Sequence, residues 1–258
     1  MHILLTNDDG IFAPGLAAIY KEICEMGEVS VVAPAASQSG AGHRVTFYGP
    51  VVCNRVDIEG LFSGHSVEGS PADCVKLGIM KLLKKPVDLV ISGMNSGANV
   101  GVNIFYSGTV AAAMEGAFFK IPAVALSLAW EDEMDYPQGA HYCAMVLKKL
   151  LPLTAEKVIN INIPQLSKGR PKGIRIVPQS TEGFDEEYVS EGNGKGQTVH
   201  QLTGGLHRDD AKAGTDTNAL AQGYITITAL QPDMTNYQQT MLLEQIQFNL
   251  NGDTDDQE

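Results

Sequence analysis

Short, uninterrupted apolar runs alternate with amphipathic segments along the first two thirds of the chain. Apolar runs of this kind lie at 3–5, 29–33, 87–92, 123–128 and 158–162. They are typical of strands buried on both faces of a parallel sheet. Apolar residues at helical spacing follow Pro14 and occur again within 69–85, 106–119 and 138–151, which predicts helices in these segments. Because strands and helices alternate, we predict an α/β fold with a Rossmann-like, doubly wound, mostly parallel sheet.

The segment before the second helix has a β-rich composition. VTFY at 45–48 and VVCNRV at 51–56 are separated by a Gly-Pro pair and are expected to be extended. The helix itself has clear start signals. Ser70 can cap it, Pro71 suits the first helical position, and Asp73 suits the positive first turn.

After about residue 166 the pattern changes. IRIVPQ and ITITAL alternate like strands and flank a polar, Gly-rich region at 181–217. A region of this length predicts either a mobile flap or a hairpin arm. We therefore expect one domain over 1–258, with a core at about 1–165. The remainder, about 166–258, is expected to be a C-terminal β-hairpin and helix elaboration that ends in a flexible acidic tail, GDTDDQE.

Composition narrows the possible partners and compartment. No apolar run approaches the roughly 18 residues that span a bilayer, and no secretion signal is present. Four widely spaced cysteines, three of them in predicted helices, indicate buried reduced thiols and a cytoplasmic protein. The formal net charge of −12 opposes binding to duplex nucleic acid. We therefore expect neither a membrane nor duplex nucleic acid as a partner.

Polar residues gather at the carboxyl ends of three predicted strands. Asp8 and Asp9 follow the first strand, Ser39 follows the second, and Asn95 follows VDLVIS. Ligands of open α/β sheets bind at this edge. Two adjacent carboxylates repel each other unless a positive charge lies between them. Carboxylate, hydroxyl and amide oxygens suit Mg²⁺ or Mn²⁺, so we predict one divalent cation per subunit.

Each of these residues also has a purely structural explanation. The NDDG sequence favours a turn, the Ser39 hydroxyl can stabilise a turn, and the Asn95 amide can bond its own backbone. Taken singly, the structural explanation is the better one for Ser39 and for Asn95. Their occurrence at corresponding strand ends favours the metal site.

A second feature is the start of the helix within 106–119. Free N–H groups at a helix N-terminus, hydroxyls and a glycine form a phosphate cradle, although Ser107 is equally well explained as an ordinary N-cap. The preceding loop, GMNSGANVGVN, is costly to order because of its glycines, and a ligand site would account for that cost. We predict that the substrate contacts are Asn7, Gly40, Asn99, Ser107, Gly108 and Thr109.

Several familiar sites are excluded at the level of sequence motifs. The chain has no GxxxxGK[ST], no GxGxxG after its first strand and no GxSxG. A receiver domain would require a phosphorylatable Asp where this chain has SGMN.

The motifs TNDDGIFAPGL, SQSG, SGMNSGANVGVN with YSGTVAAAMEG, IPAVALS and TDTNALAQGYITITAL occur in this order. In them the chain closely resembles the SurE family, the stationary-phase survival protein E nucleotidases. The resemblance implies a divalent-metal-dependent phosphomonoesterase (5′-nucleotidase) acting on nucleoside 5′- and 3′-monophosphates. It places the metal ligands on Asp8, Asp9, Ser39 and Asn95. It also implies a homodimer or homotetramer built by C-terminal exchange.

The expected mechanism is attack by a metal-activated water, with Asp8 and Asn95 as the catalytic residues. Asp8 would orient or deprotonate the nucleophile, and Ser107 to Thr109 would neutralise phosphoryl charge. Two alternatives remain open. One is a phosphatase with Asp8 as covalent nucleophile, although such enzymes use Asp-x-Asp and this chain has adjacent acids. The other is a non-enzymatic nucleotide- or metal-sensing module.

Overall fold

The computed structural model describes residues 1–258 except 59, 154–157, 182–184, 207–211, 247 and 249–258. Its main sheet contains β1 (His2–Thr6), β2 (Glu28–Pro34), β3 (Cys53–Ile58), β4 (Phe62–Val67), β5 (Leu89–Ser96), β6 (Ala123–Leu128), β7 (Val158–Ile163), β8 (Ile174–Ile176) and β11 (Ile225–Leu230). Their spatial order is β3-β4-β2-β1-β5-β6-β7-β11-β8. Every pair is parallel except β3 with β4 and β7 with β11. The predicted doubly wound, mostly parallel sheet is confirmed.

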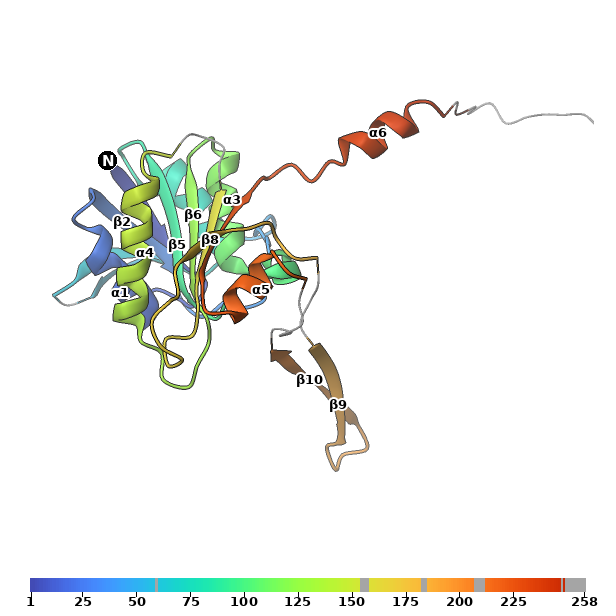
Figure 1. The fold of residues 1–258 in the computed structure, drawn as a ribbon. Coiled ribbons are helices and arrows are strands. Elements are labelled where there is room, and N and C mark those ends of the chain that lie inside the picture. The colour runs from blue at the N-terminus through green and yellow to red at the C-terminus, as the bar shows by residue number, and fades with distance from the viewer. Residues whose placement is uncertain (59, 154–157, 182–184, 207–211, 247, 249–258) are drawn as a thin grey trace, which may run out of the picture.

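Helices cover both faces of this sheet (Figure 1). The helices are α1 (Pro14–Ile23), α2 (Pro71–Leu77), α3 (Gly108–Phe118), α4 (Tyr136–Leu150), α5 (Asp216–Ala221) and α6 (Tyr237–Leu243). One core cluster, around Ile3 and Leu5, packs under α1 and α4. The other, around Leu4 and Val90, packs under α2 and α3. Because alternate residues of β1 enter opposite clusters, the run Ile3, Leu4 and Leu5 is apolar without interruption, as its sequence indicated.

A glycine brings α1 close to the end of β5. A Cβ on Gly15 would lie 2.1 Å from the Met94 carbonyl oxygen. Only a residue without a side chain allows this approach. The contact fixes the strand residue that precedes Asn95.

Three local expectations were wrong. Residues 45–48 are not a strand, because Thr46 donates its backbone N–H and hydroxyl to the Asp73 carboxylate and not to a neighbouring strand. The strand β4 was missed, because its Gly, His and Ser residues weaken the alternation. The strand β5 continues to Ser96, past the expected end at Ser92, with a register shift against β6 between Ser92 and Asn95.

The second helix begins as predicted and ends early. Ser70 and Asp73 form a capping box at the start of α2, with Ser70 Oγ accepting from Asp73 N at 3.0 Å. After Leu77 the chain continues as one π-helical turn, Gly78–Leu82, in place of the longer α-helix. On α3, helical spacing groups Phe118 with Val110, Met114 and Ala117 on one side, but Phe118 is exposed. Cys74 and Cys143 are buried as expected, but Cys24 is exposed.

The C-terminal third adds β8 and β11 to the main sheet and also forms an arm. The strands β9 (Asp185–Gly192) and β10 (Thr198–Leu206) pair as an antiparallel hairpin, the hairpin alternative for the region 181–217. In Figure 1 this hairpin and the segment carrying α6 both extend away from the core. The acidic tail GDTDDQE lies outside the described residues. Among the described helices, none combines the length and apolar character needed to cross a membrane.

Candidate metal centre

The carboxylate of Asp8 is buried and held by the first turn of α3. Thr109 donates to it twice, from Oγ1 to Oδ1 at 2.6 Å and from its backbone N to Oδ2 at 3.1 Å. Burial raises the pKa of the Asp8 carboxyl above its usual range. The charge of Asp9 adds to the rise, and the hydrogen bonds from Thr109 oppose it. The two adjacent acids therefore repel each other, as the sequence predicted.

Asp9 and Asn95 are linked through the neighbouring strand. The backbone N of Ser96 donates to Asp9 Oδ2 at 3.0 Å. Asn95 Nδ2 donates to the Gly97 carbonyl at 2.7 Å, which leaves the amide oxygen of Asn95 available as a ligand. The helix after β1 lies on one face of the sheet and the helix after β5 on the other. The site therefore lies at the topological switch point between these strands.

The loop after β2 comes to the same place. Gln38 N donates to the Asp8 carbonyl at 2.7 Å, and Ser39 Oγ lies 3.0 Å from Ser37 Oγ. A cavity of about 480 Å³ opens here, lined by Asp8, Ser39, Gly40, Asn95, Ser96, Gly97, Ala98, Asn99, Asn103, Tyr106, Ser107, Glu186 and Leu202. Three of the four predicted metal ligands line this cavity, and Asp9 contacts it through Ser96.

The predicted substrate residues have structural partners of their own. Asn7 Nδ2 donates to the Gly10 carbonyl and Asn7 Oδ1 accepts from Gly10 N, so Asn7 closes the turn after β1. Asn99 Nδ2 donates to Ser127 Oγ at 2.8 Å, while Asn99 still lines the cavity. Gly40 lines it as well, with a φ of +73°. Both explanations therefore apply to Asn99, whereas Asn7 is fully buried, does not line the cavity and has a structural partner only.

At the start of α3, two residues of the predicted phosphate cradle already form hydrogen bonds within the protein. Ser107 Oγ caps the helix by accepting from Val110 N at 3.1 Å, as the N-cap alternative required. Thr109 N is committed to Asp8. Gly108 lies against the site, since a Cβ there would be 2.8 Å from Asp8 Cβ and 3.0 Å from Pro71 Cγ. Gly108 is therefore required by the packing of α3 onto Asp8.

The donor set fits a hard divalent cation. Two carboxylates, a hydroxyl and an amide oxygen supply oxygen ligands only. Among the described residues, no Lys or Arg lines this cavity to balance Asp8 and Asp9. No group of three or more His, Cys, Asp or Glu side chains in the described part of the chain is arranged to hold a metal. A cation held here would thus have two acidic ligands completed by neutral oxygens.

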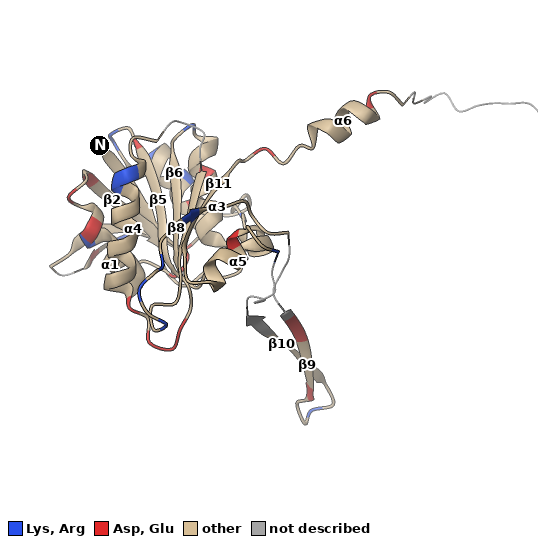
Figure 2. Ribbon diagram, in the orientation of Figure 1, with Lys and Arg blue, Asp and Glu red and all other residues tan. Residues whose placement is uncertain are grey.

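Sequence reasoning missed two kinds of cavity residue. Tyr106 is exposed at the cavity, directly before the predicted cradle, and its position next to Ser107 could have drawn attention to it. Glu186 and Leu202 come from the hairpin, where no motif marks them. Figure 2 shows acidic residues at the base of this hairpin, and Lys and Arg spread over several elements of the described chain.

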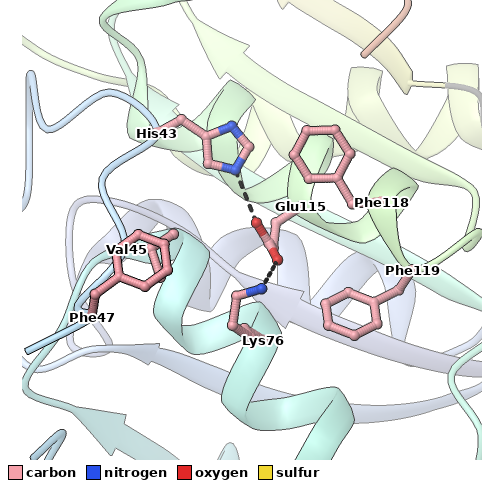
Figure 3. Close-up of a pocket in the computed structure, with 7 residues that line it drawn as sticks. All are labelled: His43, Val45, Phe47, Lys76, Glu115, Phe118 and Phe119. Carbon is pink, nitrogen blue, oxygen red and sulfur yellow. Dashed lines mark hydrogen bonds and ion pairs between the residues drawn. The ribbon is translucent and has the colours of Figure 1, made fainter. Parts of the chain in front are cut away.

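A separate ionic cluster joins the loop after β2 to the back of α3 (Figure 3). The buried Glu115 accepts from His43 Nε2 at 3.0 Å and from Lys76 Nζ at 2.7 Å. His43 also stacks on Phe118, with ring centroids 5.3 Å apart. Burial opposes ionisation of Glu115, but the contacts with His43 and Lys76 outweigh it and lower the pKa of the carboxyl. His43, which has little sequence signal, thus ties the Ser39 loop to α3.

The sheet and the oxygen-rich cavity define a doubly wound α/β protein with a ligand site at its topological switch point. A family model described as Survival protein SurE matches residues 3–186, and the chain belongs to the SurE family.

Similar proteins match over nearly the whole chain. It is 39% identical over 240 residues to "5'-nucleotidase SurE" of Syntrophus aciditrophicus, covering 92% of this chain and 90% of that protein. It is 40% identical over 239 residues to "5'-nucleotidase SurE" of Desulfitobacterium hafniense, covering 92% and 93%. The crystal structure of the SurE protein from Aquifex aeolicus superposes with a TM-score of 0.82 at 35% identity, covering 95% of this chain and 98% of that one.

Proposed function

We propose that this chain is a divalent-metal-dependent phosphomonoesterase that hydrolyses nucleoside 5′- and 3′-monophosphates to nucleoside and phosphate. The observation that carries the proposal is the convergence of Asp8, Ser39 and Asn95 on one cavity beside the start of α3. Relatives named 5'-nucleotidase SurE, matched over nearly their whole length, support the same activity.

The metal ligands in this proposal are Asp8, Asp9, Ser39 and Asn95, which would hold one Mg²⁺ or Mn²⁺ per subunit. When bound, such a cation polarises a phosphoryl oxygen and lowers the pKa of water. Asp8 is fixed for its role by the two hydrogen bonds from Thr109. The residues Asn99, Asn103, Gly40 and Ser107, which line the cavity, would contact the phosphate.

We further propose that the protein is a cytoplasmic homodimer or homotetramer. All four cysteines are free thiols, which supports a reducing compartment. The segment carrying α6 supports self-association, because it buries none of its helical residues and exposes an apolar series: Met234, Tyr237, Met241, Leu242, Leu243, Ile246 and Phe248. A second copy could cover this surface.

The test is release of inorganic phosphate from AMP by the purified protein with Mn²⁺, alongside a sample treated with a chelator. We expect phosphate release that requires the metal. A sensing module would bind AMP, with a calorimetric signal, and release no phosphate. That outcome would refute the proposed enzyme.

A further inference from the structure

One loop connects Asn95 on β5 to the start of α3. Hydrogen bonds from other parts of the chain hold the backbone of this loop in place. It runs from Gly97 to Asn103, between Asn95 and the cap of α3, and its last residues begin a 3-10 helix over Gly101–Phe105. Gly97 N donates to the Leu128 carbonyl at 2.8 Å at its start. The two points that fix its middle are Asn99 and Gly101.

Two buried asparagines of β7 fix the first point. Asn162 Oδ1 accepts from Asn99 N at 2.7 Å, and Asn162 Nδ2 donates to the Asn99 carbonyl at 3.2 Å. Asn160 Nδ2 donates to the same carbonyl at 2.7 Å. Both asparagines are fully buried, and all the amide groups that face Asn99 are paired, while Asn160 Oδ1 has no hydrogen-bond partner among the described residues. The Asn162 side chain thus bonds both the N–H and the carbonyl of Asn99, as a neighbouring strand would.

The C-terminal part of the chain fixes the second point. Asp216 Oδ2 accepts from Gly101 N at 3.0 Å, and Gln179 Nε2 donates to the Gly101 carbonyl at 2.9 Å. The other oxygen of Asp216 accepts from Ser180 N at 2.7 Å and Thr217 N at 2.8 Å. Asp216 is fully buried at the start of α5. A carboxylate that accepts three backbone N–H groups is a strong anchor.

We propose that Asp216, with Asn160 and Asn162, positions the 97–103 loop for the reaction, so that Asn99, Asn103 and the start of α3 keep their places relative to the proposed metal ligands. This rests on the proposed function. Asp216 and Asn160 contact the loop backbone and do not line the cavity, so they are positioning residues. The motif TDTNAL, which contains Asp216, and the strand VININ, which contains both asparagines, would thus hold the 97–103 loop. Neither supplies a predicted ligand.

The critical variant is Asp216→Asn. It keeps the size of the side chain but turns one acceptor into a donor that faces a backbone N–H. Displacing a catalytic group by about 1 Å costs about 100-fold, so we expect kcat to fall about 10- to 100-fold. Mn²⁺ affinity, measured by electron paramagnetic resonance, should change less than about threefold. Hydrogen exchange should become faster in peptides that cover 97–107.

The matched control is Glu131→Gln. Glu131 is also a buried carboxylate that accepts two backbone N–H groups, from Leu166 and Ser167, and it does not contact the 97–103 loop. We expect lower stability with unchanged kcat and unchanged exchange at 97–107. If Asp216→Asn does not fold, Gln179→Ala offers a milder loss at the half-buried Gly101 contact.

Equal effects of Asp216→Asn and Glu131→Gln on kcat would overturn the proposal, as would an unchanged exchange rate at 97–107 in Asp216→Asn or Gln179→Ala. Hydrogen exchange reports the loop without any reaction. A wild-type protein that shows no phosphatase activity but a loop loosened by Asp216→Asn would refute the proposed function and leave the anchoring intact.

Discussion

Thr109 donates both its hydroxyl and its backbone N–H to the carboxylate of Asp8, at 2.6 and 3.1 Å. One residue thereby ties the end of β1 to the start of α3. The contact orients Asp8 and also stabilises its ionised form, which burial alone would disfavour.

Asp8→Asn should lower phosphatase activity about 100-fold or more, because even outer-shell partners of a metal ligand contribute about 10- to 100-fold. The folded-state pKa of Asp8 is raised. Its ionisation therefore lowers the stability of the metal-free protein as pH rises above 3.8. At pH 7 without metal, the variant should be at least as stable as wild type, and the difference should fade toward acid pH. Asp57→Asn, on β3, is the control. Near-normal activity of Asp8→Asn at saturating Mn²⁺ would contradict the assignment.

Gly108→Ala should weaken Mn²⁺ binding and phosphate inhibition together. The new Cβ would lie 2.8 Å from Asp8 Cβ, so the carboxylate or α3 must move. A substitution at Gly108 thus does not separate the phosphate cradle from the metal ligands. The control is Gly192→Ala on β9, where a Cβ meets nothing within 4 Å. Calorimetric titration of both variants with Mn²⁺ and phosphate decides, and unchanged Mn²⁺ affinity in Gly108→Ala would count against this geometry.

Glu115→Gln should destabilise the protein at neutral pH by about 1–3 kcal/mol, because the Lys76 and His43 contacts lose their charged acceptor. The folded pKa of Glu115 is lowered. Its stabilising contribution is thus present above 4.5 and is lost as pH falls through the lower folded value. Denaturant unfolding from pH 3 to 7 should show the two proteins converging at the acid end. The exposed pair of Glu28 with Lys85 provides the control Glu28→Gln, with little change expected. A constant difference across this range would exclude the ionic explanation.

Removing residues 231–258 should reduce the proposed assembly to a smaller one, because the exposed apolar side chains of the segment carrying α6 are lost. Light scattering at micromolar concentration measures the mass of both forms. Met241→Asp in the intact chain tests the same surface with one substitution, since Met241 lies exposed on α6. A strictly monomeric intact protein would exclude self-association.

The reaction should give no phosphoryl transfer to an alcohol. Both oxygens of Asp8 already accept hydrogen bonds from Thr109, which makes this carboxylate a poor nucleophile. The adjacent Asp9 is not the second acid of an Asp-x-Asp pair. With glycerol in the assay, we therefore expect free phosphate alone. Phosphoglycerol, or an acid-labile phosphate on Asp8, would establish the covalent alternative instead.

The sequence predicted most of the central sheet because burial on both faces requires apolar runs, and β6 and β7 are buried throughout. It missed β4, whose Gly64 and His65 give no such run; this strand is defined by its neighbours. The convergence of Asp8, Ser39 and Asn95 followed from their positions at the carboxyl ends of predicted parallel strands. The partners of Asp8 and Gly101 could not be foreseen, because Thr109 and Asp216 are more than a hundred residues away and no local pattern encodes such contacts.

Asp8, Asp9 and Asn95 each have a fixed partner in the protein itself: Thr109, Ser96 and Gly97. The proposed ligands are therefore ordered in the folded chain without a cation. Little conformational entropy would remain to be lost on binding of a cation, which would have to offset the repulsion between the two acids. A cation that relieved this repulsion would stabilise the folded chain. Metal concentration would then govern the lifetime of the folded protein as well as its activity.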